Sequence, residues 1–254
     1  NVDGMIVQHK DWRWQVGFSI GHYKHEITEL PATELNNLKT WSLDANGNKD
    51  QQQSIRGYVT NIYGANILTA VGHAAGVFYG YQTSGVFASD LEASQAGKYG
   101  YLRYPTGISQ EPYRNFKAGD VCFVDQNGDG WINEADMVVI GDPNPDIFGN
   151  ISTSFTWKDL TLDLNFKYSL GNDIYNYQRS QLEAANNIYN QTTAVCNRWR
   201  YEHQITDMPR AMAPGNDQWV NNERFSDRWI EDGSFLKLKK VRLTYKVPVH
   251  LSWL

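Results

Sequence analysis

The chain has 254 residues, a formal net charge of −5 and a large share of aromatic residues, 13%. The mild acidity argues against a nucleic-acid partner, because nucleic-acid-binding domains carry a basic patch or stripe. No run of 18 apolar residues exists, which excludes a transmembrane helix but leaves a membrane β-barrel open, since barrel strands only alternate in polarity. The chain begins at Asn1 with no initiator Met and no signal peptide, so we expect a piece of a longer protein.

The first predicted element is a β-hairpin near the start of the chain. Residues 4–8 form a short apolar strand, residues 9–11 form the turn, and a second strand covers residues 12–21. In the second strand the apolar residues Trp12, Trp14, Val16, Phe18 and Ile20 alternate with Arg13, Gln15, Gly17, Ser19 and Gly21. A period of two is typical of a strand with one apolar and one polar face.

Part of this strand, Gly17-Phe18-Ser19-Ile20-Gly21, fits the G-x-S-x-G pattern of a hydrolase nucleophile elbow. That elbow requires a sharp turn between a strand and a helix, whereas Ser19 lies in the middle of an alternating strand. The six histidines show no metal-binding spacing. We therefore predict that the chain is not an enzyme and has no catalytic residues.

A second hairpin is predicted in the first third of the chain. Residues 67–71 and 77–83 are expected to pair across a turn at residues 72–76. Val77, Tyr79 and Tyr81 lie on one face of the second strand. We expect this hairpin to be part of the same sheet as the first one.

The clearest alternation lies in a third hairpin. Residues 147–157 and 160–170 are expected to pair across Lys158-Asp159, and in the second strand 11 residues alternate without an error. The last strand covers residues 235–247. Its alternation slips near Lys239-Lys240, which predicts a β-bulge at that point.

Three long connections, residues 29–64, 85–146 and 171–227, alternate with the short turns. Outer-membrane barrels have short periplasmic turns and long extracellular loops, and strands of about ten residues are long enough to cross a bilayer. The pattern therefore favours an antiparallel transmembrane β-barrel with about seven of its strands in this chain. The alternative is a soluble β-sandwich, in which the same apolar faces pack against a second sheet.

The long connections also hold many aromatic residues and both cysteines. Rings such as Tyr104, Tyr113 and Trp219 are suited to binding sugars or peptides, and equally to packing against one another. Cys122 and Cys196 fall in two different long connections. They either form a disulfide on the oxidising side of an outer membrane or stay unpaired.

The strongest local motif is the 12-residue segment 125–136, DQNGDGWINEAD. Calcium prefers oxygen ligands, and a loop of this length supplies them from positions 1, 3, 5, 7, 9 and 12. The predicted calcium ligands are Asp125, Asn127, Asp129, the carbonyl of Trp131, Asn133 and Asp136. Gly130 falls at the sharp turn of the loop, and Ile132 can anchor the loop on a core. Position 12 is Asp instead of Glu, so the loop resembles the dockerin-type variant. The alternative is a polar turn without a metal.

Three segments of the chain resemble the C-terminal barrel region of SusC/RagA-type TonB-dependent outer-membrane transporters. They are VGHAAGVFYGYQTSGVF (residues 71–87), the stretch from GDVCFVDQNGDGWINEADMVVIGD to YSLGNDIYN (residues 119–176) and RWIEDGSFLKLKKVRLTYKVP (residues 228–248). The resemblance implies a barrel of about 22 strands closed by an N-terminal plug. The plug, a TonB box and the last barrel strands are not recognised in this chain.

The resemblance also implies a function. Such a transporter takes up oligosaccharides or peptides through the outer membrane, with energy from TonB and with a SusD-like surface lipoprotein as partner. Outer-membrane lipid would surround the barrel, and the long loops would be extracellular. The competing interpretation is a secreted calcium-binding, carbohydrate-binding β-sandwich domain. In the first interpretation the even-numbered side chains of residues 160–170 face outward; in the second they face a packed core.

Overall fold

The structure, a computed structural model, describes residues 2–31, 36–43 and 49–247. The chain divides into two compact units, which we call the sheet unit and the loop unit. The sheet unit consists of Asn1–Lys24, Pro143–Asp173 and Asp232–Leu254. The loop unit consists of His25–Asp142 and Ile174–Glu231.

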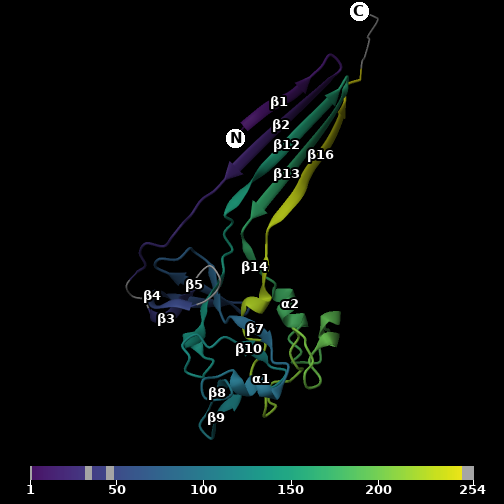
Figure 1. Cartoon of the computed structure of the whole chain (residues 1–254). Coiled ribbons are helices and arrows are strands. Elements are labelled where there is room, and N and C mark those ends of the chain that lie inside the picture. Colours follow the sequence, from purple (N-terminus) through teal and green to yellow (C-terminus); the bar gives the residue numbers. More distant parts are fainter. Residues whose placement is uncertain (1, 32–35, 44–48, 248–254) are drawn as a thin grey trace, which may run out of the picture. The chain divides into compact units, whose positions relative to one another are not determined.

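The sheet unit is one antiparallel sheet of five strands in the order β1-β2-β12-β13-β16, which lie side by side in Figure 1. The strands are β1 (Val2–Gln8), β2 (Trp12–Gly21), β12 (Ile147–Trp157), β13 (Leu160–Leu170) and β16 (Phe235–Tyr245). These segments are far apart in sequence, because the loop unit is inserted between β2 and β12 and between β13 and β16. Strands of 10 or 11 residues in β2, β12, β13 and β16 have the length of membrane-crossing strands.

Two tight turns lie at the same end of this sheet. The backbone N–H of Lys158 donates to the carbonyl of Asp11 at 2.7 Å, and the N–H of Lys246 donates to the carbonyl of Asp159 at 2.8 Å. The turn after β1 and the turn after β12 are therefore neighbours, as predicted. Lys158 has a positive φ of 51°, which the two-residue turn between β12 and β13 requires.

The register keeps polar and apolar residues on separate faces across the whole sheet. Trp14 pairs with Phe155, Phe155 with Leu162, and Leu162 with Leu243. The next residues in each strand form a polar row, Gln15, Ser154, Asp163 and Arg242. Since neighbouring side chains of a strand point to opposite faces, the pairing gives the sheet one apolar and one polar face.

A β-bulge preserves this separation in β16. Asn165 pairs with Lys240 and Phe166 with Leu238, so Lys239 is the extra residue. The bulge predicted near Lys239-Lys240 is confirmed. Without the bulge, Leu236 and Leu238 would lie on one face of the sheet and Val241 on the other.

The apolar face is not covered by a packed core. Each of the four hydrophobic clusters among the described residues belongs to the loop unit. Large apolar side chains of the sheet remain exposed, among them Phe155 at 42% and Leu243 at 66%. The indole N–H of Trp14 on this face donates to the hydroxyl of Thr153 at 2.8 Å, which satisfies a donor that lipid could not. These features fit a lipid-facing barrel wall and not a β-sandwich.

The loop unit has its own sheets and core. A five-stranded sheet has the order β11-β6-β5-β4-β3, and three strand pairs, β7–β10, β8–β9 and β14–β15, accompany it. The strands are β3 (Asn36–Leu43), β4 (Lys49–Ile62), β5 (Ala65–Ala70), β6 (Val77–Gly80), β7 (Thr83–Val86), β8 (Arg103–Ile108), β9 (Glu111–Asn115), β10 (Val121–Phe123), β11 (Val138–Gly141), β14 (Asp173–Tyr175) and β15 (Ile230–Asp232).

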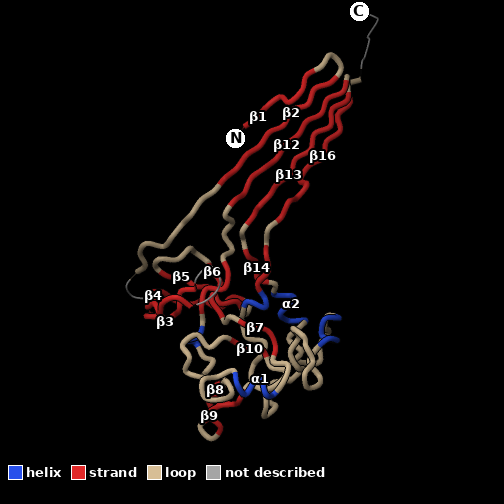
Figure 2. Tube along the Cα trace, viewed as in Figure 1, coloured by secondary structure: helices blue, strands red, loops and turns tan. Residues whose placement is uncertain are grey.

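The helices of the described residues are short and belong to the loop unit, and Figure 2 shows them in blue. They are α1 (Asp90–Gln95), α2 (Tyr177–Leu182) and the 3₁₀ helices η2 (Glu134–Asp136), η3 (Thr193–Asn197) and η4 (Asp227–Trp229). Within the described ranges, no helix has the length and apolar character needed to cross a membrane.

Two sequence-based expectations need correction here. The hairpin of residues 67–83 exists, since Ile67 pairs with Phe78 and Leu68 with Val77, but it belongs to the sheet of the loop unit. Its strands are short and buried, with Leu68 and Ala70 fully buried, so it is not a membrane hairpin. The three long connections are also not simple loops, because they fold together into this second unit. The sheet unit therefore contains five of the seven strands that we expected in it.

A buried ion pair joins two of these connections. The guanidinium of Arg210 donates to both carboxylate oxygens of Asp120, at 2.7 and 2.8 Å, and the Asn222 side chain adds a bond of 2.9 Å. Asp120 is fully buried, and burial raises the pKa of its carboxyl group while Arg210 lowers it. The bidentate pair compensates a buried charge, so it fixes residues 210–222 against residues 117–120.

Introducing one charge into β13 tests the assignment of its two faces. Leu164→Lys is expected to destabilise the protein by about 2–4 kcal/mol, because the charge enters the lipid-facing side near the middle of the strand. Asn165→Lys, one residue further on the polar face, is the matched control and is expected to cost much less. Denaturant unfolding of both variants in lipid bilayers gives the two values. Equal losses would contradict the assignment.

Candidate functional site

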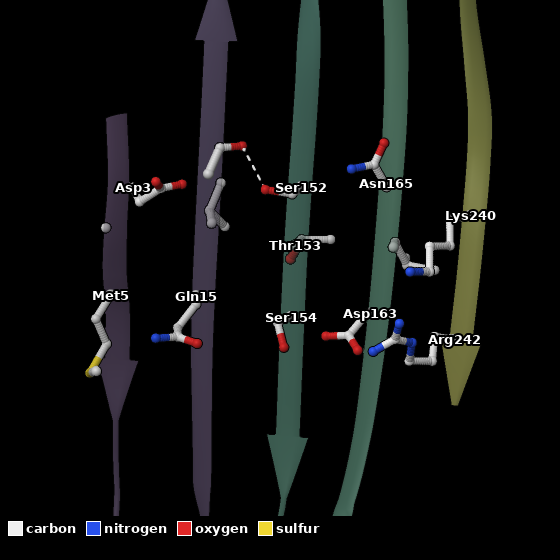
Figure 3. Close-up of a pocket in the computed structure, with 14 residues that line it drawn as sticks. Asp3, Met5, Gln15, Ser152, Thr153, Ser154, Asp163, Asn165, Lys240 and Arg242 are labelled. Atoms are coloured by element: carbon white, nitrogen blue, oxygen red, sulfur yellow. Dashed lines mark hydrogen bonds between the residues drawn. The ribbon is translucent and has the colours of Figure 1, made fainter. Parts of the chain in front are cut away.

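The polar face of the five-stranded sheet forms a hollow of about 550 Å³ (Figure 3). All five strands contribute to it, and the register arranges its side chains in two rows. One row is Asp3, Gly17, Ser152, Asn165 and Lys240, and the other is Met5, Gln15, Ser154, Asp163 and Arg242. A hollow on the polar side is what the inner wall of a barrel provides.

Gly17 makes room in this hollow. A Cβ atom at this position would collide with the carboxylate of Asp3 and the hydroxyl of Ser152. The Ser152 hydroxyl instead donates to the carbonyl of Gly17 at 3.4 Å (Figure 3). Gly17, the first residue of the G-x-S-x-G pattern, thus serves close packing of the wall. Ser19 lies inside β2, and no nucleophile elbow is formed.

Basic residues outnumber acidic residues on the polar face. The register places Arg13, Lys167, Lys237, Lys240 and Arg242 on it, but only two acidic residues, Asp3 and Asp163. This balance is opposite to the net charge of −5 for the chain. The wall therefore presents a positive field to whatever occupies the hollow.

The segment 125–136 is a compact turn in the loop unit. The carboxylate of Asp125 accepts the backbone N–H groups of Gly128 and Gly130, at 2.7 and 2.8 Å. Asn127 accepts from the N–H of Asp129, and Asp129 accepts from the N–H of Trp131. Gly130 has a φ of 83°, the left-handed conformation that the sharp turn at position 6 needs.

The end of the segment folds back on its beginning. The two carboxylate oxygens of Asp136 accept the N–H groups of Gln126 and Asn133, at 2.9 and 2.8 Å, and the Asn133 side chain caps η2. Ile132 is 1% exposed within the largest hydrophobic cluster, so the predicted anchor is confirmed. Burial, together with the charges of Asp125 and Asp129, raises the pKa of Asp136 to about 7.

The donor set of this segment suits calcium in kind. It consists of hard oxygen atoms, and each carboxylate oxygen that accepts one N–H keeps a second lone pair. Among the residues that the structure describes, no group of three Asp, Glu, His or Cys side chains is placed to hold a metal ion. The other predicted ligands, besides the carboxylates of Asp125, Asp129 and Asp136, are the carbonyl of Trp131 and the amide oxygens of Asn127 and Asn133.

Several aromatic residues of the long connections pack against one another. Tyr104 contacts Trp219 with ring centroids 5.9 Å apart, and Tyr113 contacts Trp131 at 5.6 Å. The guanidinium of Arg103 stacks on both Tyr113 and Trp131. Of the two interpretations, packing within the loops accounts for these rings. Cys122 and Cys196 are both free thiols.

The comparisons with known proteins agree on one type of transporter. No protein-family model matches the chain. The chain is 27% identical over 98% of its length to the TonB-dependent receptor P3 of Formosa agariphila, and 31% identical over 72% of its length to the TonB-dependent receptor P26 of the same organism. It is 27% identical over 59% of its length to the TonB-dependent receptor SusC of Bacteroides thetaiotaomicron. It covers 21%, 17% and 14% of these relatives, respectively.

Solved structures show the same fold. The RagAB peptide importer in its "closed-closed" state matches 97% of this chain with a TM-score of 0.62 at 23% identity, and the chain covers 22% of it. The structure of the RagAB peptide transporter matches 96% of the chain with a TM-score of 0.61 at 20% identity. The relatives are receptors and transporters and not enzymes, in agreement with the prediction made from Ser19. The chain belongs to the SusC/RagA type of TonB-dependent transporters, which are outer-membrane proteins, and it corresponds to about a fifth of the length of such a transporter.

Proposed function

We propose that the transporter imports oligosaccharides or peptides across the outer membrane with energy from TonB. The observation that carries the proposal is the hollow on the polar face of the five-stranded sheet, with its apolar opposite face exposed. A sheet that is apolar outside and polar inside separates lipid from an aqueous passage. The names of the relatives, TonB-dependent receptors and peptide transporters, also support an import function.

The two units have different roles in this proposal. The sheet unit forms part of the barrel wall, and its two tight turns face the periplasm. The loop unit lies outside the cell, where it meets substrate and a SusD-like surface lipoprotein. The short turns and the long connections of the chain support this orientation, because outer-membrane barrels place long loops outside. TonB would act through a plug domain.

Growth of a deletion strain on a panel of glycans and peptides tests the import function. We expect the strain to lose growth on one substrate class and to regain it when the gene is restored. The substrate class lost would identify the cargo. A transporter gene whose Gln15 is replaced by Trp should restore growth poorly, because the large ring fills the polar hollow. Ile20→Trp, on the lipid-facing side of the same strand and outside the hollow, is the matched control and should restore growth fully. Unchanged growth of the deletion strain on every glycan and peptide of the panel would contradict the proposal.

We also propose that segment 125–136 binds calcium as a structural ion. The support is chemical: three carboxylates, Asp125, Asp129 and Asp136, lie in one short turn, and their mutual repulsion contributes to the raised pKa of Asp136. A divalent cation would relieve that repulsion and hold the turn in one conformation. The remaining ligands would be Asn127, Asn133 and the carbonyl of Trp131. The ion would stiffen the loop unit and would not take part in transport chemistry.

Limited proteolysis with increasing calcium tests this site. Cleavage within residues 119–142 should slow as calcium rises, with a midpoint of about 0.1–1 mM, the range of extracellular modules. Asp129→Ala should abolish the calcium effect while leaving the five-stranded sheet intact, because the sheet is held by its own hydrogen bonds. Asp217→Ala, which removes an exposed carboxylate elsewhere in the loop unit, should behave like the unmodified protein. Cleavage independent of calcium would mean that the segment is only a polar turn.

A further inference from the structure

A second cavity, of about 470 Å³, lies entirely within the loop unit. Its walls include Tyr81, Tyr104, Asn133, Glu134, Asn221 and Arg224. The volume falls within the range of about 300–1,000 Å³ that is typical of small-ligand sites. The mixture of tyrosines, amides and one guanidinium gives the cavity flat apolar surfaces together with hydrogen-bonding groups.

Arg224 is held rigidly in the wall of this cavity. Its guanidinium carbon lies 4.7 Å from the ring centroid of Phe123, 4.8 Å from that of Tyr81 and 5.0 Å from that of Tyr104. Its N–H groups donate to the carbonyls of Val220 at 3.1 Å, Asn221 at 3.2 Å and Ile132 at 3.4 Å. The orientation of the guanidinium is therefore set before any ligand arrives, which lowers the entropic cost of binding.

Among the described residues the Arg224 guanidinium is not paired with a carboxylate at ion-pair distance, and the charge of Glu223 acts on it only from further away. By contrast, Arg114, Arg179 and Arg210 each pair with a carboxylate. Carbonyl groups satisfy N–H donors but do not neutralise a charge, and a desolvated, unpaired charge is costly. Burial lowers the pKa of Arg224, which reflects this cost, and Tyr81, Tyr104 and the carboxylate of Glu223 offset part of it.

The negative charge of Glu134, which lines the same cavity, repels a bound anion. Glu134 is exposed, so water screens its effect more strongly than that of the partly buried guanidinium. The net preference of the cavity is therefore set by Arg224. The polar face of the sheet unit, with five basic and two acidic side chains, has the same sign of charge.

We propose that this cavity binds a carboxylate group of the imported ligand, with Arg224 as its ion-pair partner and Tyr81 and Tyr104 as flanking rings. A guanidinium carries five N–H groups, so the three carbonyl contacts of Arg224 leave N–H capacity for a carboxylate. The rings provide a surface for the adjoining part of the ligand. The inference rests on the proposed import of oligosaccharides or peptides. Both substrate classes can carry carboxylates, as uronic acids or as acidic residues.

Calorimetric titration of the purified protein in detergent with two ligand pairs distinguishes these sources. One pair is trigalacturonic acid and its methyl ester, and the other is the tripeptide Glu-Glu-Glu and Gln-Gln-Gln. We expect one acidic ligand to bind at least about tenfold more tightly than its neutral counterpart, the effect of one charged hydrogen-bonded pair. Arg224→Lys keeps the charge but loses the planar fork, and it should weaken this ligand by about tenfold.

Glu134→Gln keeps the test valid if Arg224→Lys disturbs folding. Removing the exposed like charge should tighten acid binding by about two- to fivefold at low salt and leave the neutral ligands unchanged. Asp159→Asn, the same charge change in a turn of the sheet unit, is the control and should have no effect. Equal affinity for acidic and neutral ligands, no binding of either acid, or no response to Glu134→Gln would overturn the site. If the restored gene still supports growth on the panel of glycans and peptides while the site fails these tests, the import proposal stands and only the carboxylate site is wrong.

Discussion

The cross-strand register of the five-stranded sheet is the constraint on which the rest of the structure depends. Since side chains alternate along a strand, a slip of one residue would move every apolar side chain of that strand to the polar face. The full pairing of β12 with β13, from Ile147 with Leu170 to Trp157 with Leu160, fixes the central pair. The bulge at Lys239 then corrects the phase of β16, where the sequence itself changes phase. The hollow, the exposed apolar face and the positive wall all follow from this register.

The loop unit is stabilised differently, because its strands are short and its connections are long. Buried polar groups take over part of the role that long hydrogen-bonded strands have in the sheet. Asp120 and Arg210 form a buried bidentate ion pair, and Asp125 and Asp136 satisfy backbone N–H groups of a tight turn. Arg224 differs from these, since carbonyl groups bind three of its N–H groups but no carboxylate among the described residues pairs with it. A charge that the fold leaves uncompensated is available to a ligand, and this difference separates a binding group from a structural one.

Alternation along the chain was enough to predict the sheet unit. The strands β1, β2, β12, β13 and β16, their tight turns and the bulge at Lys239 follow from polarity alone, because in a membrane wall the environment of each face is uniform. The hairpin of residues 67–83 was assigned to the wrong sheet because alternation does not show whether both faces of a strand are buried. Val77 and Tyr79 alternate with their neighbours, but all four residues of β6 are buried, and only tertiary packing reveals this. The strands of the loop unit, such as β7 and β10, are too short to show a period. Arg224 also carries no sequence signal, since its role depends on rings at positions 81, 104 and 123 that meet only in the fold.

The central claim is that alternate residues of β13 face lipid and an aqueous interior, and spin-label accessibility along this strand measures it most directly. Single cysteines at positions 160–170 would carry the label, after both native free thiols, Cys122 and Cys196, are changed to serine. Collision rates with oxygen, which concentrates in lipid, should peak at the even positions from Leu160 to Leu170. Collision rates with a water-soluble nickel chelate should peak at Thr161, Asp163, Asn165 and Lys167. Two profiles in opposite phase with a period of two residues are the predicted result. Profiles without a period, or even positions shielded from both reagents as in a packed protein core, would contradict the account.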